Sequence, residues 1–417
     1  MRSYLQFILS DWRLLGFGLV LTLYSNVGQT FFIGLFGAEL RGAFDLSHRA
    51  FGTIYAAATL CSGFLLLWAG RQIDRFDLRL FTLIVCLGLI GATFIMALVP
   101  HVVILVLAIF MLRFFGQGLL GHTAITTMAR YFDANRGKAI SIALFGYPIG
   151  EALLPLIAVG LIAAIGWRMT WGSIGIVLAV TLLPLVFWLL RGQSERHAAL
   201  KAHHAEAASR NDAPARRSWT AGEVFRDPRF LFIMPAVLGA PLLVTGMFFH
   251  QEHIVNERGW SLTWYAACFI GFAVVQFPTS FTTGILIDRI GAGRLLPLIL
   301  LPLALGLGLM ALITHPWVVP VYLGLIGVTI GMIGPIVNSH WAESYGVLHI
   351  GAIRAMVSAM MVVSTAICPL VFGAMIDAGA SVSQIAGGGL AYCVLTGALA
   401  SAALRRSAGD DTSTMKS

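Results

Sequence analysis

The chain contains the sequence Gly70-Arg71-Gln72-Ile73-Asp74-Arg75 at the end of one long apolar run. A similar sequence, Gly284-Ile285-Leu286-Ile287-Asp288-Arg289-Ile290-Gly291, ends another run six segments later. An architecture that repeats after six apolar segments, with the same charged residues at the same place, is typical of membrane proteins built from two parallel halves. The repeated sequence therefore predicts the fold class, although it does not identify a ligand.

The composition indicates a membrane protein. Of the 417 residues, 58% are hydrophobic and only 11% are charged. A hydrocarbon core about 30 Å thick requires a helix of about 20 apolar residues, and the runs are continuous rather than alternating, which argues against a β-barrel. We therefore predict an all-α membrane protein with twelve transmembrane helices in two pseudo-symmetric six-helix halves. The predicted spans are 14–38, 50–70, 79–99, 102–125, 138–163, 168–190, 230–251, 262–286, 295–314, 317–340, 353–376 and 386–404.

The basic residues predict the orientation. Among the 27 Lys and Arg residues, only Arg41, Arg49, Arg168 and Arg258 fall on one side of the predicted membrane, and Arg113 lies inside a helix. Because cytoplasmic loops carry an excess of Lys and Arg, both termini are expected in the cytoplasm. The net charge of +8 then reflects membrane insertion rather than nucleic-acid binding. We expect a multi-pass protein of the cell membrane, the inner membrane of a bacterium, present as a monomer and without a cleavable signal peptide.

The predicted domain boundaries follow the polar segments. An N-terminal six-helix half covers 1–190, a cytoplasmic linker covers 191–229, a C-terminal half covers 230–405 and a cytoplasmic tail covers 406–417. The linker is rich in Ala, Arg and His and has no apolar core, so we interpret it as a solvated tether. The five cysteines all fall inside predicted helices without paired spacing, as expected of small buried apolar residues.

The two halves also share a second, weaker similarity. Arg136-Gly137-Lys138-Ala139 opens the fifth predicted helix, and Gly351-Ala352-Ile353-Arg354 opens the eleventh. Both helices then reach a proline, Pro155 or Pro369. These positions lie in the register that a six-plus-six repeat predicts.

These motifs resemble those of the major facilitator superfamily. The resemblance covers essentially the whole chain and includes the repeated Gly-x-x-x-Asp-Arg signature, the Arg-Gly-x-Ala sequence at 136–139 and the central linker. Arg113-Phe114-Phe115-Gly116-Gln117-Gly118 resembles the Arg-containing motif of that family's fourth helix. Within the superfamily, the chain is closest in style to prokaryotic monocarboxylate and oxalate/formate carriers.

The chain departs from these patterns at three places. Asp77 stands where the first signature copy of the family has Gly. The basic residues that anion carriers of this group often have in helices eight and eleven are missing, with Gln276 the nearest polar residue in helix eight. The helix-five pattern of drug/proton antiporters is present only as the fragment Gly146-Tyr147-Pro148-Ile149-Gly150. The first two departures weaken the analogy with anion carriers, and the third weakens the analogy with drug exporters.

Two ionisable residues lie near the middle of predicted helices, Arg113 in helix four and Glu151 in helix five. A charge in hydrocarbon costs about 2.5–3.5 kcal/mol on insertion scales, so each is a candidate functional residue. We predict that they are neighbours in a central cavity, where protonation of Glu151 releases Arg113 to bind an anionic substrate. The alternative is a structural ion pair that only fixes helix packing.

Further polar residues are predicted to line the same cavity. Asn26 and Gln29 share one face of helix one, and Gln117 lies one turn beyond Arg113. The predicted substrate and proton-coupling residues are Arg113, Glu151, Asn26, Gln29, Gln117, Tyr147, Gln276 and Asn338. For each of the uncharged residues, an ordinary interhelical hydrogen bond is the alternative.

The signature residues are predicted to control a gate rather than to contact substrate. The resemblance implies that Asp74 and Asp288 hold the cytoplasmic side closed in the outward-open state; the alternative is a loop that only sets orientation. The predicted gating residues are Gly70, Asp74, Arg75, Gly284, Asp288 and Arg289.

The predicted function is secondary active transport by alternating access, and specifically proton-coupled transport of a small organic anion such as a monocarboxylate. Efflux of amphipathic or toxic compounds by proton antiport is the alternative, and a non-transporting membrane component is a third hypothesis. The sequence has no Gly-x-x-x-x-Gly-Lys-Ser/Thr motif and no grouping of nucleophile, base or metal ligands. We therefore expect no enzyme activity, no cofactor and no metal; the expected partners are a small-molecule substrate, protons and the lipid bilayer, without nucleic acid.

Overall fold

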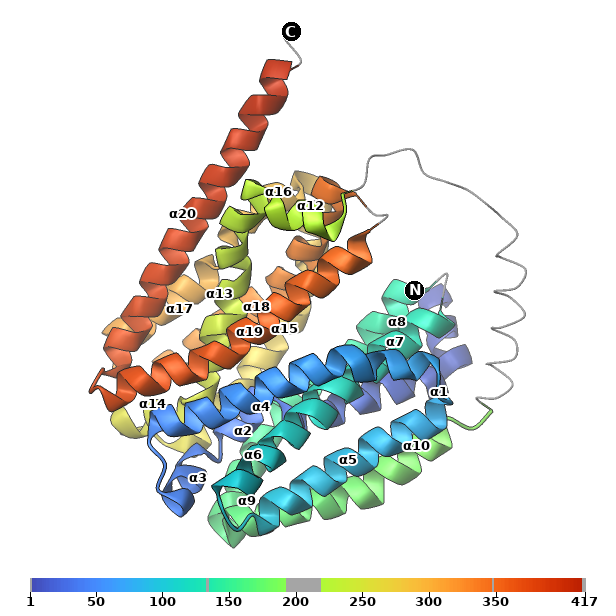
Figure 1. The fold of residues 1–417 in the computed structure, drawn as a ribbon, viewed down its shortest axis with the longest axis vertical. Coiled ribbons are helices and arrows are strands. Elements are labelled where there is room, and N and C mark those ends of the chain that lie inside the picture. Colours follow the sequence, from blue (N-terminus) through green and yellow to red (C-terminus); the bar gives the residue numbers. More distant parts are fainter. Residues whose placement is uncertain (1, 133–134, 193–218, 347–348, 415–417) are drawn as a thin grey trace. The chain divides into compact units, whose positions relative to one another are not determined.

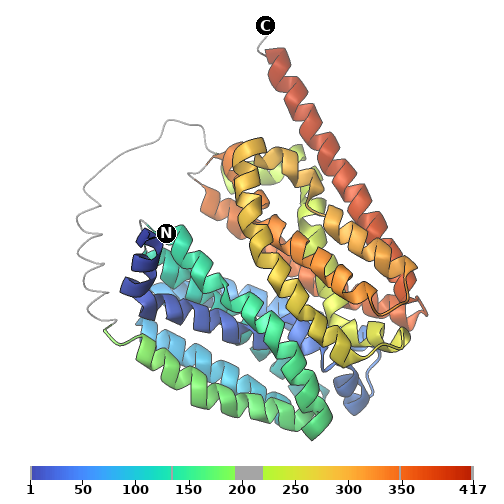
Figure 2. The same cartoon turned by 180° about the vertical axis from the view of Figure 1, so that it is seen from behind.

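The computed structural model describes residues 2–132, 135–192, 219–346 and 349–414, and their side chains except at 2–5, 71, 74 and 405–414. All regular elements in these ranges are helical (Figures 1 and 2). The first half contains α1 (Arg2–Ser25), η1 (Asn26–Gly28), α2 (Thr30–Gly34), α3 (Gly37–Phe44), α4 (His48–Ala69), η2 (Gly70–Asp74), α5 (Leu78–Leu98), α6 (Val102–Met111), η3 (Leu112–Leu120), α7 (Gly121–Tyr131), α8 (Arg136–Leu144), α9 (Gly146–Val177), η4 (Leu178–Leu182) and α10 (Leu183–Leu189).

The second half is also helical throughout its described residues. It contains α12 (Ala221–Arg226), α13 (Pro228–Phe249), α14 (Gln251–Glu257), α15 (Leu262–Ile290), α16 (Ala292–Leu295), η5 (Leu296–Leu298), α17 (Leu301–Leu312), α18 (Val318–Tyr345), α19 (Ile350–Asp377) and α20 (Val382–Thr414). Most of the predicted linker, 193–218, lies outside the described residues.

Eleven described helical segments are long and apolar enough to cross a membrane. One of them, Arg136–Leu189, has 54 residues, or about 80 Å of helix at 1.5 Å per residue. This length is enough for two crossings of a 30 Å core, and the segment is broken at Gly166, where φ is +77°. The predicted all-α membrane fold is confirmed, and the number of segments agrees with about twelve crossings.

Local sequence determines where several of these helices begin and end. The Asp77 carboxylate accepts hydrogen bonds from the backbone N–H groups of Arg79 at 2.8 Å and Leu80 at 3.4 Å, so it is the N-cap of α5. This role explains an acidic residue where the family signature has Gly. In the second copy Gly291 ends α15 with φ of +83°, a backbone conformation that favours glycine.

The chain divides into two compact units, each assembled from several stretches of sequence. Unit 1 comprises Met1–Phe32, Cys61–Gly150 and Leu161–Arg216, and unit 2 comprises Ile33–Leu60, Glu151–Gly160 and Arg217–Ser417. Unit 2 therefore includes two short segments of the first half of the chain. The predicted domain boundaries at 190, 229 and 405 stay a prediction.

Each unit has its own core. In unit 1, α1 packs against α7 and α8, and α5 packs against η3; Trp171 is fully buried there, with its ring 5.6 Å from that of Phe32. In unit 2, α15 packs along α18, α17 packs between α18 and α20, and α13 contacts α19 and α20. Gly327 and Gly331 allow the close approach of α18 to α15, because a side chain at Gly331 would meet the Gln276 carbonyl.

The first predicted span corresponds to a membrane-length segment, Gln6–Gly34. The prediction that Asn26 and Gln29 share one face of helix one is wrong, because the helix is interrupted there. After Ser25 the backbone forms one 3₁₀ turn, Asn26–Gly28, and Gln29 is extended with φ of −78° and ψ of 154°. Hydropathy did not predict this break because the residues on both sides remain apolar. The break lies where the chain approaches the fourth span.

Candidate functional site

The candidate site in unit 1 is built where the interrupted first span meets the fourth span. The fourth span changes from α6 to a π-helix, η3, over Leu112–Leu120 and then continues as α7. A π-helix has a wider turn than an α-helix and occurs often at functional sites. The π-helical segment contains both Arg113 and Gln117.

Two glycines bring these segments together. A Cβ atom on Gly28 would overlap the Leu112 carbonyl oxygen and lie 2.6 Å from the Gln117 nitrogen. A Cβ atom on Gly116 would lie 2.9 Å from the Gly28 Cα. Neither position has room for a side chain, so the contact between η1 and η3 requires glycine on both sides.

Arg113 is buried at this contact, with 1% of its surface exposed. Its Nη1 group donates to the Gly28 carbonyl oxygen and to the Thr30 hydroxyl, each at 3.3 Å. The break in the first span makes these acceptors available, because a carbonyl in a regular helix is otherwise bonded to the N–H four residues later. The interruption of helix one and the buried guanidinium of helix four therefore belong to one arrangement.

The other predicted polar residues of unit 1 lie around the same break. The Asn26 amide is fully buried and donates to the carbonyls of Thr22, Leu23, Gly146 and Tyr147 at 3.0–3.4 Å. It thereby joins the end of α1 to the start of α9. Gln29, Gln117 and Tyr147 are each partly exposed, and Gly121 of α7 leaves space for the Tyr147 hydroxyl.

The remaining predicted residues, Glu151, Gln276 and Asn338, belong to unit 2. Glu151 lies in the first turns of α9, and its Oε2 atom is buried without a hydrogen-bond donor among the described residues. Gln276 lies within α15, and its buried Oε1 atom also has no hydrogen-bond donor among the described residues. Asn338 is exposed on α18 and its amide donates to the Gly334 carbonyl oxygen at 2.8 Å. The predicted pairing of Glu151 with Arg113 stays a prediction.

The two signature copies have different local structures. The first copy forms the 3₁₀ turn η2 and is held to α7 by His122, whose ring nitrogen lies 3.1 Å from the Gly70 carbonyl, and by Arg130, which donates to the Ile73 carbonyl at 3.3 Å. Arg75 is exposed, and the side chain of Asp74 lies outside the described residues.

The second copy forms the last turns of α15 rather than a loop after it. Gly284 is partly exposed there, whereas Asp288 and Arg289 are exposed. The gating role of both copies stays a prediction.

Sequence reasoning missed a cluster of charged and aromatic groups in unit 2. We call Arg41, His48, Glu252, His253 and Asp377 the α3–α14 cluster. The Arg41 guanidinium donates to the Glu252 carboxylate at 2.9 Å, and Glu252 also accepts a hydrogen bond from Asn256. The Asp377 carboxylate accepts from the backbone N–H groups of His48 at 3.1 Å and Arg49 at 2.9 Å. Segment 33–60 is thereby joined to α14 and α19.

Glycine and aromatic contacts reinforce this junction. A side chain on Gly52 of α4 would overlap the Pro369 carbonyl, and a side chain on Gly373 of α19 would overlap the His48 carbonyl. The Phe51 ring stacks on Phe249 with centroids 4.7 Å apart. Segments from the two halves of the sequence are therefore packed in direct backbone contact at the cluster.

Three imidazole rings meet beside these groups. The His48 ring centroid lies 4.7 Å from that of His253 and 5.6 Å from that of His250, and a His250 ring nitrogen lies 2.9 Å from the Pro369 carbonyl oxygen. Burial lowers the pKa of His250 to about 3 and also lowers the pKa of His253, although Glu257 and Glu252 oppose the second shift. The charged forms of these two histidines are therefore disfavoured in this structure.

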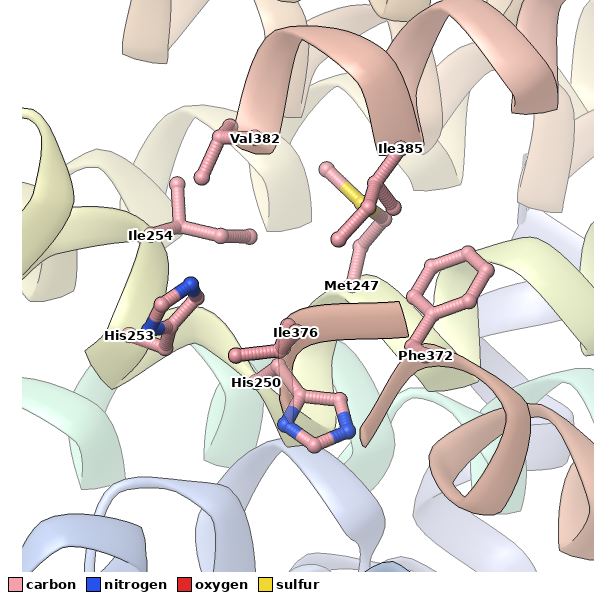
Figure 3. A pocket seen from close by; sticks show the side chains of 8 residues that line it. All are labelled: Met247, His250, His253, Ile254, Phe372, Ile376, Val382 and Ile385. Carbon is pink, nitrogen blue, oxygen red and sulfur yellow. The ribbon is translucent and has the colours of Figure 1, made fainter. Parts of the chain in front are cut away.

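Figure 3 shows the apolar side of this region, where His250 and His253 face side chains of α13, α19 and α20 across a small void. Its volume is about 10 Å³, which is at the lower limit for a single water molecule. The void is too small for an organic substrate. No group of three or more His, Cys, Asp or Glu residues in the described part of the chain is arranged to hold a metal ion.

Comparison with known proteins agrees with this architecture. A profile of the Major Facilitator Superfamily matches residues 18–369. Two solved structures of a bacterial homolog to the human lysosomal transporter Spinster are similar in fold, each with 15% sequence identity. The inward-facing and occupied form has a TM-score of 0.68 and covers 95% of this chain and 97% of that one. The inward-facing and unoccupied form has a TM-score of 0.64 and covers 94% and 96%.

The many long apolar helices define a polytopic membrane protein. The chain belongs to the Major Facilitator Superfamily, whose members are secondary transporters that work by alternating access. A search of curated proteins finds no match. These comparisons show the superfamily, and the predicted likeness to monocarboxylate and oxalate/formate carriers stays a prediction.

Proposed function

We propose that this protein transports a small organic anion, such as a monocarboxylate, in symport with protons. The observation that carries the proposal is Arg113, a fully buried cation held by the backbone of an interrupted transmembrane helix. A guanidinium in a site that excludes water binds a carboxylate strongly, because it offers paired donors in fixed geometry. Ionisable residues inside membrane spans mark substrate and ion pathways.

Glu151 is the proposed proton site. It is a carboxylate within a membrane span with one oxygen lacking a hydrogen-bond donor among the described residues. In the proposed cycle, the ionised Glu151 competes with substrate for Arg113, and its protonation frees the guanidinium for the anion. Asn26, Gln29, Gln117, Tyr147, Gln276 and Asn338 complete the polar lining in this proposal.

Alternating access requires a closed outer end in one state. We assign that role to the α3–α14 cluster, which joins residues from both halves of the sequence through the Arg41–Glu252 ion pair. With both termini in the cytoplasm, as the basic residues predict, this cluster lies on the outer side, and its closure belongs to the inward-facing state. The proposed location is a bacterial inner membrane, and the proposed form is a monomer.

The exporter alternative receives less support. Its cavity would be lined by the aromatic side chains of Phe31, Phe32, Phe114, Phe115 and Trp264. The first three are buried, with exposed fractions of 4%, 2% and 7%, whereas Phe115 and Trp264 are partly exposed. Phe32 packs on Trp171 and Phe114 packs on Phe110. These rings contribute to helix packing in unit 1.

The proposal is tested by transport in proteoliposomes with a pH gradient and a panel of short carboxylates. Wild-type protein is expected to accumulate a carboxylate when the outside is acidic, and Arg113→Gln is expected to abolish uptake. Glu151→Gln is expected to retain exchange of carboxylate across the membrane but to lose accumulation driven by the pH gradient. Arg113→Lys tests whether positive charge alone suffices.

The matched control is Glu343→Gln, which neutralises an exposed carboxylate at the end of α18. It is expected to leave uptake unchanged. Folding of every variant is checked by its thermal unfolding and its elution from a sizing column. Accumulation driven by the pH gradient in folded Arg113→Gln or Glu151→Gln would overturn the coupling mechanism. A response to amphipathic cations alone would favour the exporter.

A further inference from the structure

A second cleft with an arginine lies in unit 2, between the facing sides of α18 and α19. Its volume is about 210 Å³, well above the roughly 10–15 Å³ that a single water molecule requires on the same measure. The cleft is lined by Ile333, Gly334, Val337, Asn338 and Trp341 of α18 and by Arg354, Val357, Ser358 and Met361 of α19. Both sets follow the three- and four-residue spacing of a single helix face.

The polar groups of this cleft are unusual for membrane-spanning helices. Arg354, Asn338 and Ser358 are exposed, although each lies inside a segment that is apolar enough to cross the membrane. Charged side chains in such segments face a water-filled cavity or a partner rather than lipid. Arg354 forms no ion pair with a carboxylate in the described part of the chain, so its charge is available to a ligand.

The rest of the lining is apolar and includes a deeply buried ring. Trp341 is fully buried, and its indole N–H has no acceptor among the described residues. The ring is supported by Phe230, with centroids 5.3 Å apart, and by Tyr345, at 5.9 Å. The cleft therefore has apolar walls, one cation, and the amide and hydroxyl groups of Asn338 and Ser358.

We propose that this cleft is a second substrate-binding subsite, which holds an organic anion by its carboxylate at Arg354 and by its apolar body along Val337, Val357 and Met361. The proposal rests on the proposed anion transport and adds a substrate class to it: an anion with an apolar chain rather than one built of carboxylates alone. The site lies near the ends of α18 and α19 at Tyr345 and Ile350. The cleft shares Asn338 with the lining proposed above, and its own cation is Arg354 rather than Arg113.

The cleft can also be filled without changing its charge. A Cβ atom on Gly334 would meet no heavy atom within 4 Å, so a larger side chain there enters open space rather than the protein interior. Gly324 on the same helix likewise has no neighbour within 4 Å but does not line the cleft. Gly334→Leu fills the cleft, whereas Gly324→Leu makes the same substitution on the same helix outside the cleft. A comparison of the two variants therefore isolates the effect of filling the cleft.

The binding experiment uses the full chain in detergent with three probes: hexanoate, acetate and hexanamide. Hexanoate is expected to bind most tightly, because only hexanoate has both the charge and the apolar chain. Arg354→Gln is expected to weaken hexanoate binding at least about tenfold, or ~1.4 kcal/mol, with little effect on hexanamide. Arg354→Lys is expected to restore part of the affinity.

Gly334→Leu is expected to weaken binding of both hexanoate and hexanamide, whereas Gly324→Leu is not. Arg294→Gln, which removes an exposed arginine of α16 outside the cleft, controls for net charge and is expected to bind hexanoate as wild type does. Equal hexanoate affinity in wild type, Arg354→Gln and Gly334→Leu would overturn the subsite.

The same variants distinguish failure of the subsite from failure of the proposed function. Arg113→Gln is expected to lose uptake while Arg354 and the cleft still give a measurable difference between hexanoate and hexanamide. If uptake of carboxylates requires Arg113 but not Arg354, the transport proposal stands and the subsite is wrong. If no carboxylate is transported but hexanoate binds through Arg354, the subsite stands and the proposed transport is wrong.

Discussion

Single glycines determine whether the first and fourth spans can meet. Gly28 and Gly116 lie where the two backbones touch, and neither has space for a Cβ atom. Close approach of helices through small residues is common in membranes, where packing and hydrogen bonds replace the hydrophobic effect between helices. At this contact the approach also presents the Gly28 carbonyl to Arg113.

Replacement of Gly28 by Ala is expected to destabilise the protein by about 1–3 kcal/mol, the typical cost of forcing extra atoms into a packed interior. The reason is that the added methyl group would overlap the Leu112 carbonyl oxygen. Thermal unfolding in detergent measures the change, and carboxylate uptake is expected to fall with it. Gly160→Ala is the control, because a Cβ there meets nothing within 4 Å; equal stability of the two variants would contradict the proposed contact.

His250, which lies beside the α3–α14 cluster, is expected to make the stability of the protein sensitive to acid. Its pKa is about 3 in the closed structure, against a usual value of 6.5. A lowered histidine pKa means that its stabilising contribution is complete above pH 6.5 and decreases as the pH falls from 6.5 toward 3, because in this range the unfolded state binds the proton and the folded state does not. Between pH 7.5 and pH 5 the loss is about 2 kcal/mol.

Other groups face this ring and modify the response. Burial is the main cause of the low pKa of His250; the Pro369 carbonyl opposes it, whereas His48, His253 and Arg41 reinforce it. Thermal unfolding at pH 7.5 and 5 is expected to show a smaller difference for His250→Gln than for wild type. His101→Gln, at an exposed histidine, is expected to retain the full difference; an unchanged pH response in His250→Gln would show that another group is responsible.

At the scale of elements, the short helices α3 and α14 connect parts of the chain that lie far apart in the sequence. Helix α3 has only eight residues and α14 has seven, yet Arg41 and Glu252 link them at 2.9 Å. The exposed side-chain fractions are 19% and 8%, so this pair is better protected from solvent than an ordinary surface ion pair. A partly buried pair is costly to break, because one charge is then left without its partner.

Reversal of one charge is expected to separate α3 from α14. Arg41→Glu places two carboxylates together and is expected to destabilise this contact by about 1–3 kcal/mol, between the values of exposed and buried pairs. The double variant Arg41→Glu with Glu252→Arg is expected to recover most of the loss. A double-mutant cycle by thermal unfolding measures the coupling, and a coupling near zero would show that the pair is incidental.

At the scale of the whole molecule, alternating access links one end of the transporter to the other. If the α3–α14 cluster closes the outer side, its disruption should favour the outward-open state and close the cytoplasmic side. Of the five cysteines, only Cys61 is exposed and the other four are buried. A single replacement, Cys61→Ala, therefore prepares the chain for labelling experiments.

In the Cys61→Ala background, Ser358→Cys places a reactive thiol in the cleft between α18 and α19. A membrane-impermeant maleimide applied from the cytoplasmic side is expected to label it readily, and several-fold more slowly when Arg41→Glu is added. Glu343→Cys, at an exposed end of α18, is expected to react equally in both backgrounds. Unchanged labelling of Ser358→Cys would contradict the link between the two ends.

Much of the fold was predictable because membrane insertion depends on local sequence. Apolar runs of about 20 residues predict spans wherever they occur, since hydrocarbon requires internally bonded helices. The sequence therefore predicted the helical fold class and the family. It also identified Arg113, because a charge in a span is conspicuous.

The arrangement around Arg113 was not predictable from the sequence. The break after Ser25 and the π-helical segment at 112–120 depend on contact between distant backbones, and hydropathy carries no record of such contacts. The prediction that helix eleven lacks a basic residue is wrong, because Arg354 stands in the first turns of α19. It was overlooked as a ligand-binding residue because an arginine at the end of a span also serves orientation. Only the cleft that Arg354 lines together with Asn338 and Trp341 favours ligand binding over a role in orientation alone.

By itself, the amino-acid sequence determined that this protein is a helical membrane protein with a repeated architecture, because the apolar residues of each helix determine whether it lies in lipid. Its motifs also identified the family. The tertiary structure alone decided which residues come together: Gly28 with Gly116 and Arg41 with Glu252 in direct contact, and Arg354 with Asn338 in the lining of one cleft. Such encounters depend on the rotation of each helix about its axis. Nearly uniform apolar runs leave that rotation undefined until the helices pack.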